Sequence, residues 1–429
     1  MNIHHHDETT KVIHGDCIET MNAMPPESVD AIVTDPPYGL SNTTPAQVAD
    51  TITKWAGGDR DHVPTGRGFM GKSWDAFVPP PAVWDECLRV LKPGGHMMVF
   101  AGSRTQDLMG LSIRLAGFEM RDSLAWLYGS GFPKSHDVGK AIDKLAGAER
   151  EVVGPGKYSG RGRSNNLPAV GWSDEENKRL GVSADSVITA PATPEAAQWD
   201  GWGTALKPAF EPIVLARKPI AEKTVARNVL AHGTGAINVD ACRIATDDNL
   251  NGGGYSDTTT TGTFLLDGAG SVDELRALAA AGEKTPNGRD AQATLARALA
   301  AKERVGEYVQ PSGRWPANVL LDHHAAGWVD EQSGEASRFF YTAKAPKRER
   351  PNVDGVQHPT VKPLAIMEWL IRLVTPPGGV LLDPFAGSGT TLEAARKAGF
   401  SSIGIEAEET YLPLIDQRLQ RSNTGPTED

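Results

Sequence analysis

The sequence predicts an α/β protein whose main sheet is built from both ends of the chain. Short apolar segments alternate with amphipathic helical segments over about the first 130 residues. The same alternation returns at residues 364–419. Between these regions Gly, Pro, Ser and charged residues dominate and the alternation is lost. We therefore expect one open sheet interrupted by loop-rich material.

Each element is predicted from its apolar spacing and its end signals. A helix over 82–91 places apolar side chains on one face and stops at Lys92-Pro93-Gly94-Gly95. The expected strands are 11–14, 30–34, 96–100, 123–127, 211–216, 380–382 and 402–405. The expected helices are 17–24, 82–91, 108–116, 138–146, 272–281, 291–304, 364–374, one from about Thr391, and 409–419.

Composition narrows the class of protein. The 429 residues, 39% hydrophobic and 23% charged, suit an ordinary globular enzyme of two or three domains. There is no apolar run of about 18 residues and no basic-then-apolar N-terminus, so we expect a cytoplasmic protein without a membrane span. The three cysteines are far apart and lack CxxC spacing, which argues against disulfides and metal. We expect His4-His5-His6 to be a frayed, functionless terminus, with a purification remnant or weak metal site as alternatives.

The formal net charge of −11 does not by itself indicate a DNA-binding protein. Positive charge is local instead, and a basic face on an acidic body attracts phosphates only within roughly 8–10 Å. Each cluster alone is weak evidence. The clustered basic residues are Arg161, Arg163, Lys207, Arg217, Lys218, Lys344, Lys347, Arg348 and Arg350.

The segment Asp35-Pro36-Pro37-Tyr38 follows the apolar strand 30–34. A ring amine is a poor nucleophile, and the Asp35 carboxylate and Pro36 carbonyl can accept its N–H groups and stabilise developing positive charge. Tyr38 offers a face for base stacking, worth about 1–3 kcal/mol. Open α/β sheets bind ligands where strands end. We therefore predict a site for a planar amine such as adenine N6 or cytosine N4, a plain turn being the alternative.

The segment from Asp383 to Thr390 is a glycine turn between a strand and a helix. Its glycines let the backbone approach a ligand, and the helix N-terminus favours an anionic group. It is neither the G-x-G-x-x-G fingerprint nor a phosphate loop. Glu406, after strand 402–405, can bridge two ribose hydroxyls. The turn fits a nucleoside carrying a methionine as well as NAD, and the base site at Asp35 favours the former.

In this order the segments resemble those of the DNA amino-methyltransferases of the permuted β class. The resemblance implies a Rossmann-like, seven-stranded, mostly parallel sheet of the class I methyltransferase type, with one antiparallel strand at 211–216. It also implies S-adenosyl-L-methionine as methyl donor and base flipping in double-stranded DNA. The similar segments, over about the first 130 and last 75 residues, are Gly15-Asp16, Thr34 to Gly39, His358 to Pro363, Asp383 to Thr390, and Glu406.

The resemblance also implies residue roles. Asp35, Pro36, Pro37 and Tyr38 form the catalytic segment. In the cofactor site, Asp16 contacts adenine, Glu406 contacts ribose, and residues 358–362 meet the methionine carboxylate. For Lys362, capping a helix or binding a phosphate is the alternative. The expected cofactor residues are Asp16, His358, Thr360, Lys362, Asp383, Phe385, Ala386, Gly387, Ser388, Gly389, Thr390 and Glu406.

The middle of the chain departs from a compact family member, and we expect target recognition there. Segments 131–135 and 199–203 are similar to those of methyltransferases often carried by bacteriophages. Trp126, Trp199 or Trp202 could stack on the flipped base, although core packing is commoner. Candidate DNA contacts are Arg161, Arg163, Arg314, Lys344 and Arg348. The expected division is 1–128 (catalytic half), 129–205 (irregular loops), 206–217 (returning strand), 218–357 (target recognition, with an insertion near 247–305), 358–420 (cofactor half) and 421–429 (disordered tail).

Adenine N6 is the favoured target, because related cytosine enzymes more often carry Ser in place of Asp35. A protein or RNA amine methyltransferase of this type would carry Asn there and place the cofactor loop first. An inactive DNA-binding homologue need keep none of Asp35, Tyr38, Gly387 or Glu406. A homodimer, a partner restriction endonuclease and the recognition sequence stay open.

Overall fold

The computed structural model describes residues 2–66, 68, 71, 73–129, 135–155, 187–246, 248, 250, 267–269, 271–305, 311–343, 349–358 and 360–423. The chain divides into two compact units. The first joins Met1–Gly129 to Phe210–Asp429, and the second is Ser130–Ala209. The second unit covers nearly the range that we expected to be irregular, 129–205.

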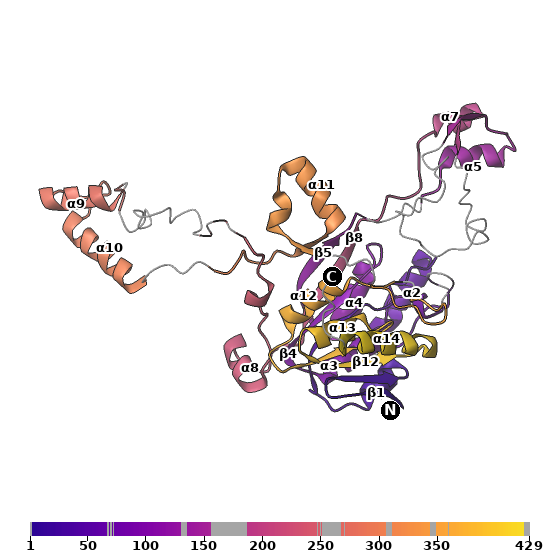
Figure 1. The fold of residues 1–429 in the computed structure, drawn as a ribbon, viewed down its shortest axis with the longest axis horizontal. Coiled ribbons are helices and arrows are strands. Elements are labelled where there is room, and N and C mark those ends of the chain that lie inside the picture. Colours follow the sequence, from indigo (N-terminus) through magenta and orange to yellow (C-terminus); the bar gives the residue numbers. More distant parts are fainter. Residues whose placement is uncertain are drawn as a thin grey trace. The chain divides into compact units, whose positions relative to one another are not determined.

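The described residues of the first unit form a 10-stranded sheet in the order β1-β2-β12-β11-β3-β4-β8-β5-β9-β10 (Figure 1). The predicted α/β class is confirmed, but the strand count of seven is wrong. The run from β2 to β5 is the expected sheet, and β1 on one edge and β9 and β10 on the other extend it. The strands are β1 Asn2–His6, β2 Thr10–His14, β3 Val29–Thr34, β4 Leu91–Phe100, β5 Glu119–Leu127, β8 Phe210–Arg217, β9 Val319–Asp322, β10 Tyr341–Ala343, β11 Val380–Asp383 and β12 Ser401–Glu406.

Strand direction follows the prediction in the central sheet. β8 is antiparallel to both β4 and β5, as expected for 211–216. The pairs β2–β12, β12–β11, β11–β3 and β3–β4 are all parallel. Parallel neighbours require crossover connections, and here the C-terminal strands β12 and β11 lie between the N-terminal strands β2 and β3. In Figure 1 the yellow C-terminal strand β12 accordingly lies beside the indigo N-terminal strands.

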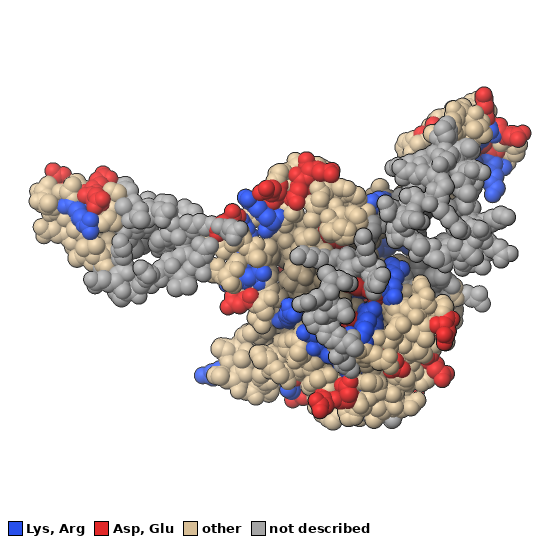
Figure 2. Space-filling model, viewed as in Figure 1, with Lys and Arg blue, Asp and Glu red and all other residues tan. Residues whose placement is uncertain are grey.

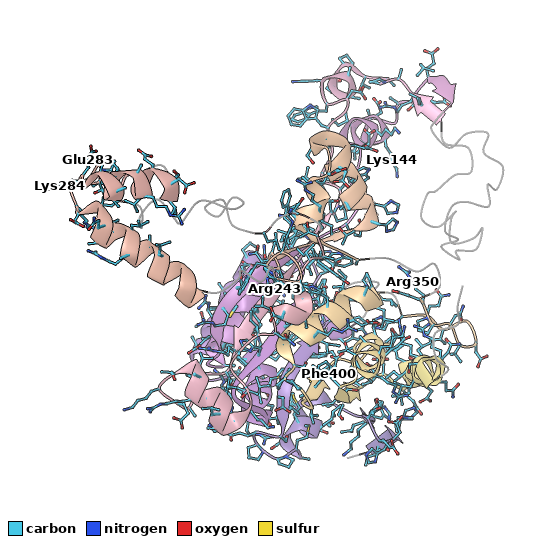
Figure 3. The ribbon with its side chains drawn as sticks, turned by 60° about the vertical axis from the view of Figure 1, so that its left-hand side comes forward. Lys144, Arg243, Glu283, Lys284, Arg350 and Phe400 are labelled. Carbon is cyan, nitrogen blue, oxygen red and sulfur yellow. The ribbon has the colours of Figure 1, made fainter. Side chains whose placement is uncertain are left out.

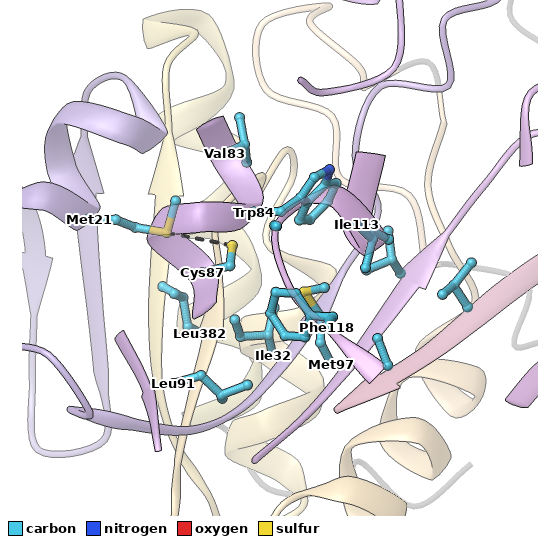
Figure 4. Packing of buried hydrophobic residues seen from close by; sticks show 14 of the residues in the cluster. Met21, Ile32, Val83, Trp84, Cys87, Leu91, Met97, Ile113, Phe118 and Leu382 are labelled. Carbon is cyan, nitrogen blue, oxygen red and sulfur yellow. Dashed lines mark hydrogen bonds between the residues drawn. The ribbon is translucent and has the colours of Figure 1, made fainter. Parts of the chain in front are cut away.

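Helices cover both faces of this sheet. Alternation along β3 sends Ile32 into a cluster with α1, α3 and α4, while Ala31 and Val33 join a cluster with α12 and α13. Figure 4 shows Leu382 from β11 in the same cluster as Ile32 from β3. The helices of this unit are α1 Cys17–Asn22, α2 Pro45–Ala56, α3 Pro81–Val90, α4 Gln106–Leu115, α8 Val225–His232, α9 Val272–Ala281, α10 Ala291–Val305, α11 His323–Ser333, α12 Leu364–Val374, α13 Thr390–Lys397 and α14 Leu412–Asn423, with short 3-10 helices η2 Ser73–Asp75, η3 Asp240–Cys242, η4 Ala336–Phe339 and η5 Glu409–Tyr411.

The prediction of a frayed N-terminus is wrong. β1 pairs antiparallel with β2, and the Asp7 carboxylate accepts the backbone N–H groups of Thr9 and Thr10 to close the turn between them. His4 Nε2 lies 2.9 Å from a carboxylate oxygen of Asp416. An exposed edge strand made of histidines lacks the apolar alternation that reveals a strand.

β4 begins at Leu91, five positions before the expected start. The Pro-Gly-Gly segment does end α3, as predicted, but it also forms an irregularity within the strand. The register with β3 shifts between the pair Val29–Leu91 and the pair Ala31–His96. Gly94 takes a φ of 81°, which favours glycine. The same residues therefore serve as helix stop and β-bulge.

The region 218–357, expected to be irregular, contributes two strands to the sheet. β9 pairs in parallel with β5 and β10 pairs in parallel with β9. Both strands are too short for their alternation to be recognised in the sequence. The predicted disordered tail 421–429 is also wrong in part, since α14 runs to Asn423. Residues 424–429 lie outside the described residues.

The helices α9 and α10 form a hairpin with a small apolar cluster of its own. Figure 3 labels Glu283 and Lys284 in the turn between them. The residues of the small cluster are Ala269, Leu275, Ala279, Ala291 and Ala298.

None of the helices in the described part of the chain is long and apolar enough to cross a membrane.

The described residues of the second unit, 135–155 and 187–209, form a short two-stranded sheet and two helices. The buried Asp143 carboxylate accepts the backbone N–H groups of Ala192 and Thr193 and pairs with Arg150. Trp199 and Trp202 are exposed and their ring centroids lie 5.0 Å apart. The elements of this unit are α5 Val138–Leu145, β6 Val152–Pro155, β7 Val187–Thr189 and α7 Pro194–Gln198.

Candidate active site

The two motifs lie on neighbouring parallel strands. β3 and β11 pair at Ala31–Leu381 and Ile32–Leu382, so both strands end at the same edge of the sheet. At that edge the Thr34 hydroxyl donates to Asp383 Oδ1 over 2.7 Å. The segment after Thr34 and the glycine turn after Asp383 therefore begin side by side, although the two residues are 349 positions apart.

Four side chains from three separate parts of the chain meet beside this edge and form what we call the carboxylate cluster: Asp35, Tyr38, Glu211 and Lys362. The Tyr38 hydroxyl donates to Asp35 Oδ1 (2.8 Å) and Glu211 Oε2 (3.0 Å). Lys362 Nζ lies 2.6 Å from Asp35 Oδ2 and 3.4 Å from Glu211 Oε2. Each carboxylate is thus bonded to the same phenol and the same ammonium.

Burial and charge fix the protonation of the two donors. The Lys362 side chain is only 7% exposed. Burial alone would lower the pKa of Lys362, but the charges of Asp35 and Glu211 raise it above its ordinary value. Burial, followed by the same two charges, raises the pKa of Tyr38 well above its usual range. At neutral pH Lys362 is therefore a cation and Tyr38 a neutral hydrogen-bond donor.

The loop that carries Tyr38 is held by buried hydrogen bonds. The Asp75 carboxylate accepts the backbone N–H groups of Gly39 (2.9 Å) and Leu40 (3.3 Å). The Thr105 hydroxyl donates to the Tyr38 carbonyl over 2.6 Å. Gly39 takes a φ of 67°, and a Cβ there would lie 2.6 Å from the Val78 nitrogen. The loop is therefore locked around Tyr38.

The glycine turn is tied to the end of β12. The Glu406 carboxylate accepts the backbone N–H groups of Gly387 (2.6 Å) and Glu408 (2.8 Å). Gly387 and Gly389 have φ values of 54° and 82°. A Cβ on Gly387 would lie 3.1 Å from His358 Nε2. The backbone is therefore open to a ligand here only because glycine occupies these positions.

Two buried acids at this edge have raised pKa values. Burial raises the pKa of Asp383 to about 6, although hydrogen bonds from Thr34 and Thr391 oppose the rise. Burial raises the pKa of Glu406 to about 7, against the two backbone donors. A carboxyl kept in an environment that disfavours its charge is typical of a functional site.

Most of the predicted residues lie at this edge. Phe385 is half-buried, Ala386, Ser388 and Thr390 are buried in the turn, and Pro36 and Pro37 continue the segment after β3. His358 Nδ1 lies 2.8 Å from the Thr360 carbonyl, and its ring contacts Tyr411 at 4.7 Å.

Two predicted cofactor residues make protein contacts that the sequence did not predict. Asp16 caps α1 by accepting the N–H groups of Ile18 and Glu19, and its neighbour Gly15 donates to the Glu406 carbonyl. Lys362 lies in the carboxylate cluster, not at the glycine turn. The sequence could not place it, because its partner Asp35 is 327 positions away.

Of the five predicted DNA-contact residues, only Arg314 is among the described residues, and it already has protein partners. Arg314 pairs with Asp248 and lies 4.5 Å from the Phe339 ring centroid. Trp126 is 8% exposed and packs edge-on against Phe100, so it belongs to the core. On the face of the first unit that Figure 2 draws, Lys and Arg side chains gather near the middle. Asp and Glu side chains lie toward the lower edge of that face. Arg161, Arg163, Lys344 and Arg348 lie outside the described residues.

Two residues of the site were not predicted, Glu211 and Asp75. Glu211 is a charged residue at the start of an otherwise apolar strand, and that strand is antiparallel. The start of β8 therefore lies where the parallel strands end, as the hydrogen bond from Ala101 N–H to the Pro212 carbonyl shows. This combination is a signal that sequence reasoning can use. Asp75 has no comparable signal.

The fold and site together define an α/β protein with a carboxylate cluster and a glycine turn at the ends of adjacent parallel strands. A family model described as DNA methylase (N6_N4_Mtase) matches residues 29–417. The chain therefore belongs to this family of DNA methylases.

Curated relatives match over short stretches. The type II methyltransferase M.ScaI of Streptomyces caespitosus is 46% identical over 72 residues, which are 17% of this chain and 24% of that protein. The type II methyltransferase M2.DpnII of Streptococcus pneumoniae is 45% identical over 67 residues, 16% of this chain and 25% of that protein. The chain thus spans about a quarter of each relative's length.

Solved structures are similar only at low scores. The M1.HpyAVI–SAM complex is 14% identical and covers 96% of this chain and 98% of its own, with a TM-score of 0.37. The cytosine-N4-specific PvuII DNA methyltransferase is 13% identical and covers 97% of this chain and 91% of its own, with a TM-score of 0.40. These likenesses are too low to argue from.

Proposed function

We propose that this protein transfers a methyl group from S-adenosyl-L-methionine to adenine N6 in double-stranded DNA. The observation that supports this most is the placement of Asp35 and Tyr38 beside the turn of Gly387 and Glu406, on adjacent strands of one sheet. The family covers both adenine N6 and cytosine N4. Asp35 favours adenine, since related cytosine enzymes more often carry Ser there.

The residues at the glycine turn fit the proposed cofactor. S-adenosyl-L-methionine would supply a methyl group on a positively charged sulfur. The buried Glu406 carboxylate can accept ribose hydroxyls, and the absence of a Cβ at Gly387 leaves room for close backbone approach. A contact of Asp16 with the adenine ring stays a prediction, consistent with its exposed side chain and the tie between Gly15 and Glu406.

The residues that follow β3 would bind the target amine and accept its proton. The Asp35 carboxylate accepts an N–H of the target amine and so makes its lone pair available. As the nitrogen bonded to the methyl carbon, the bond from that carbon to the cofactor sulfur would break and leave its electron pair on sulfur. The nitrogen would then carry a positive charge and release a proton, for which the Asp35 carboxylate is the acceptor. The Pro36 carbonyl is a second acceptor, and the Tyr38 ring offers a stacking face. No covalent link to the protein is needed.

The proposed reaction requires the target base to leave the helix. The amine of a stacked, paired base cannot reach a carboxylate at the edge of a protein sheet, so the nucleotide must rotate out at a cost of a few kcal/mol. Contacts with the DNA backbone would repay this cost, and the basic residues between 129 and 357 remain the proposed source.

The test is methylation of double-stranded DNA by the purified chain with radiolabelled cofactor, followed by identification of the methylated nucleoside. We expect N6-methyladenine. Asp35→Ala should abolish transfer and leave the cofactor dissociation constant unchanged, while Asp122→Ala, an exposed aspartate on β5, should behave as wild type. N4-methylcytosine as the product would overturn the adenine assignment. Full activity of Asp35→Ala would remove that residue from the mechanism.

A further inference from the structure

Every donor that the structure places on Asp35 also reaches Glu211. The Tyr38 hydroxyl lies 2.8 Å from Asp35 and 3.0 Å from Glu211. The Lys362 ammonium lies 2.6 Å from Asp35 and 3.4 Å from Glu211. On Asp35 the two donors occupy different oxygens, Oδ1 and Oδ2, whereas on Glu211 both reach Oε2. Glu211 is thus an alternative acceptor for the whole set.

This arrangement matters because both Asp35 oxygens are engaged. Each oxygen keeps a second lone pair, but the Lys362 ammonium, 2.6 Å from Oδ2, competes with the amine for the negative charge of Asp35. Asp35 therefore accepts the amine best when the donors shift toward another carboxylate. A buried ammonium that loses its only carboxylate is strongly destabilised. Lys362 avoids this destabilisation, because the Glu211 carboxylate already lies 3.4 Å from its ammonium. The same holds for the Tyr38 hydroxyl, whose burial makes a lost hydrogen bond costly.

We propose that Glu211 is a positioning residue for methyl transfer, which takes over Lys362 and Tyr38 so that the Asp35 carboxylate can accept the target amine. This inference rests on the proposed function. Glu211 touches neither substrate nor cofactor in this account, and it acts through Lys362 and Tyr38.

The charge of the cluster supports this role. Two carboxylates and one ammonium leave one net negative charge beside the place where the amine becomes positive. Without the charge of Glu211, Asp35 and Lys362 would form a neutral pair, and no net negative charge would remain to stabilise the positive charge that develops on the amine. In a medium of effective dielectric about 20, a unit charge about 6–12 Å from the reacting nitrogen changes the rate by about 10- to 100-fold.

The experiment compares single-turnover methyl transfer at saturating cofactor and DNA in four variants of the full chain. Glu211→Gln keeps the shape and removes the charge, and Glu211→Asp keeps the charge. The double variant Glu211→Gln with Lys362→Met removes one charge of each sign. Glu119→Gln is the matched control. Glu119 on β5 pairs with Arg217 at the end of β8, whereas Glu211 lies at the start of β8. Cofactor affinity and melting temperature are measured for each.

We expect Glu211→Gln to slow transfer by about 10- to 100-fold with unchanged cofactor affinity. Glu211→Asp should be faster than Glu211→Gln. The double variant should also be faster than Glu211→Gln, because Asp35 is then free of its ion pair. If Glu211 had a purely structural role, neither Glu211→Asp nor the double variant would transfer the methyl group faster than Glu211→Gln.

The inference and the proposed function fail in different ways. Wild-type transfer by Glu211→Gln overturns the inference, and so does a double variant no faster than the single one. In both cases wild type still methylates DNA and Asp35→Ala does not, so the proposed function stands. If wild type methylates no DNA, the proposed function itself is wrong and the inference falls with it.

Discussion

Replacing Glu406 by Gln should make the protein more stable above neutral pH and weaken cofactor binding. Glu406 is 7% exposed, and its burial raises the pKa to about 7, although the N–H groups of Glu408 and Gly387 bond to it. The charged form of this side chain is therefore disfavoured by the fold. A glutamine side chain at this position would resemble the protonated acid, because it has nearly the same shape and carries no charge.

The sign and size of the stability effect follow from linkage. The unfolded chain releases the Glu406 proton near pH 4.5, whereas the folded protein holds it to about pH 7. Raising the pH through this interval therefore favours the unfolded state, and the loss is complete above about pH 7. The gap corresponds to roughly 3 kcal/mol. Asp383, whose pKa is raised to about 6, also loses stability as the pH rises, and its charge adds to the raised pKa of Glu406.

Urea unfolding at pH 5 and pH 8 tests this prediction. The free energy of unfolding of Glu406→Gln should exceed that of wild type by about 1 kcal/mol at pH 5 and by roughly 3 kcal/mol at pH 8. Calorimetric titration with S-adenosyl-L-methionine should show a loss of about 1.5–3 kcal/mol in binding, the value of a charge-assisted hydrogen bond. The exposed Glu409→Gln serves as control. A stability difference independent of pH would refute the burial argument, and unchanged affinity would refute the ribose assignment.

Three further predictions concern the loops around the site. Asp75→Ala, which removes the acceptor for two backbone N–H groups, should slow methyl transfer by about tenfold or more without changing cofactor affinity; an unchanged rate would contradict its positioning role. Gly387→Ala and Gly378→Ala both force alanine into a positive φ and should each lose about 1–2 kcal/mol in urea unfolding. Only Gly387→Ala should also weaken cofactor binding, because only there would the Cβ meet His358; equal binding by both would contradict this. Removing residues 265–305 should leave a soluble enzyme with wild-type cofactor affinity, since α9 and α10 pack on each other, and loss of soluble protein would show otherwise.

Sequence reasoning succeeded where local pattern decides structure. The apolar run of β3, its end at Asp35 and the glycine turn after β11 are all local features, and α12 has the predicted bounds of 364–374. The antiparallel strand β8 was placed from the resemblance and its apolar residues. These features fix the sheet and the two segments that carry the chemistry.

The missed features depend on contacts that no local pattern shows. β9 and β10 have only 4 and 3 residues, with β10 at one edge of the sheet, and β1 at the other edge has no buried residue. The role of Glu211 depends on Tyr38, which is 173 positions away. The position of Lys362 depends on Asp35 in the same way. Only the folded sheet brings these side chains together.

The central claim is that Asp35 and the glycine turn, from opposite ends of the chain, form one methyl-transfer site for a DNA base. Modification-sensitive sequencing of DNA from a methylation-free host tests it most directly, with wild type and Asp35→Ala expressed in parallel. The account predicts N6-methyladenine at one recurring sequence with wild type and none with Asp35→Ala. Unmodified DNA with wild type, or the same marks with both proteins, would contradict it.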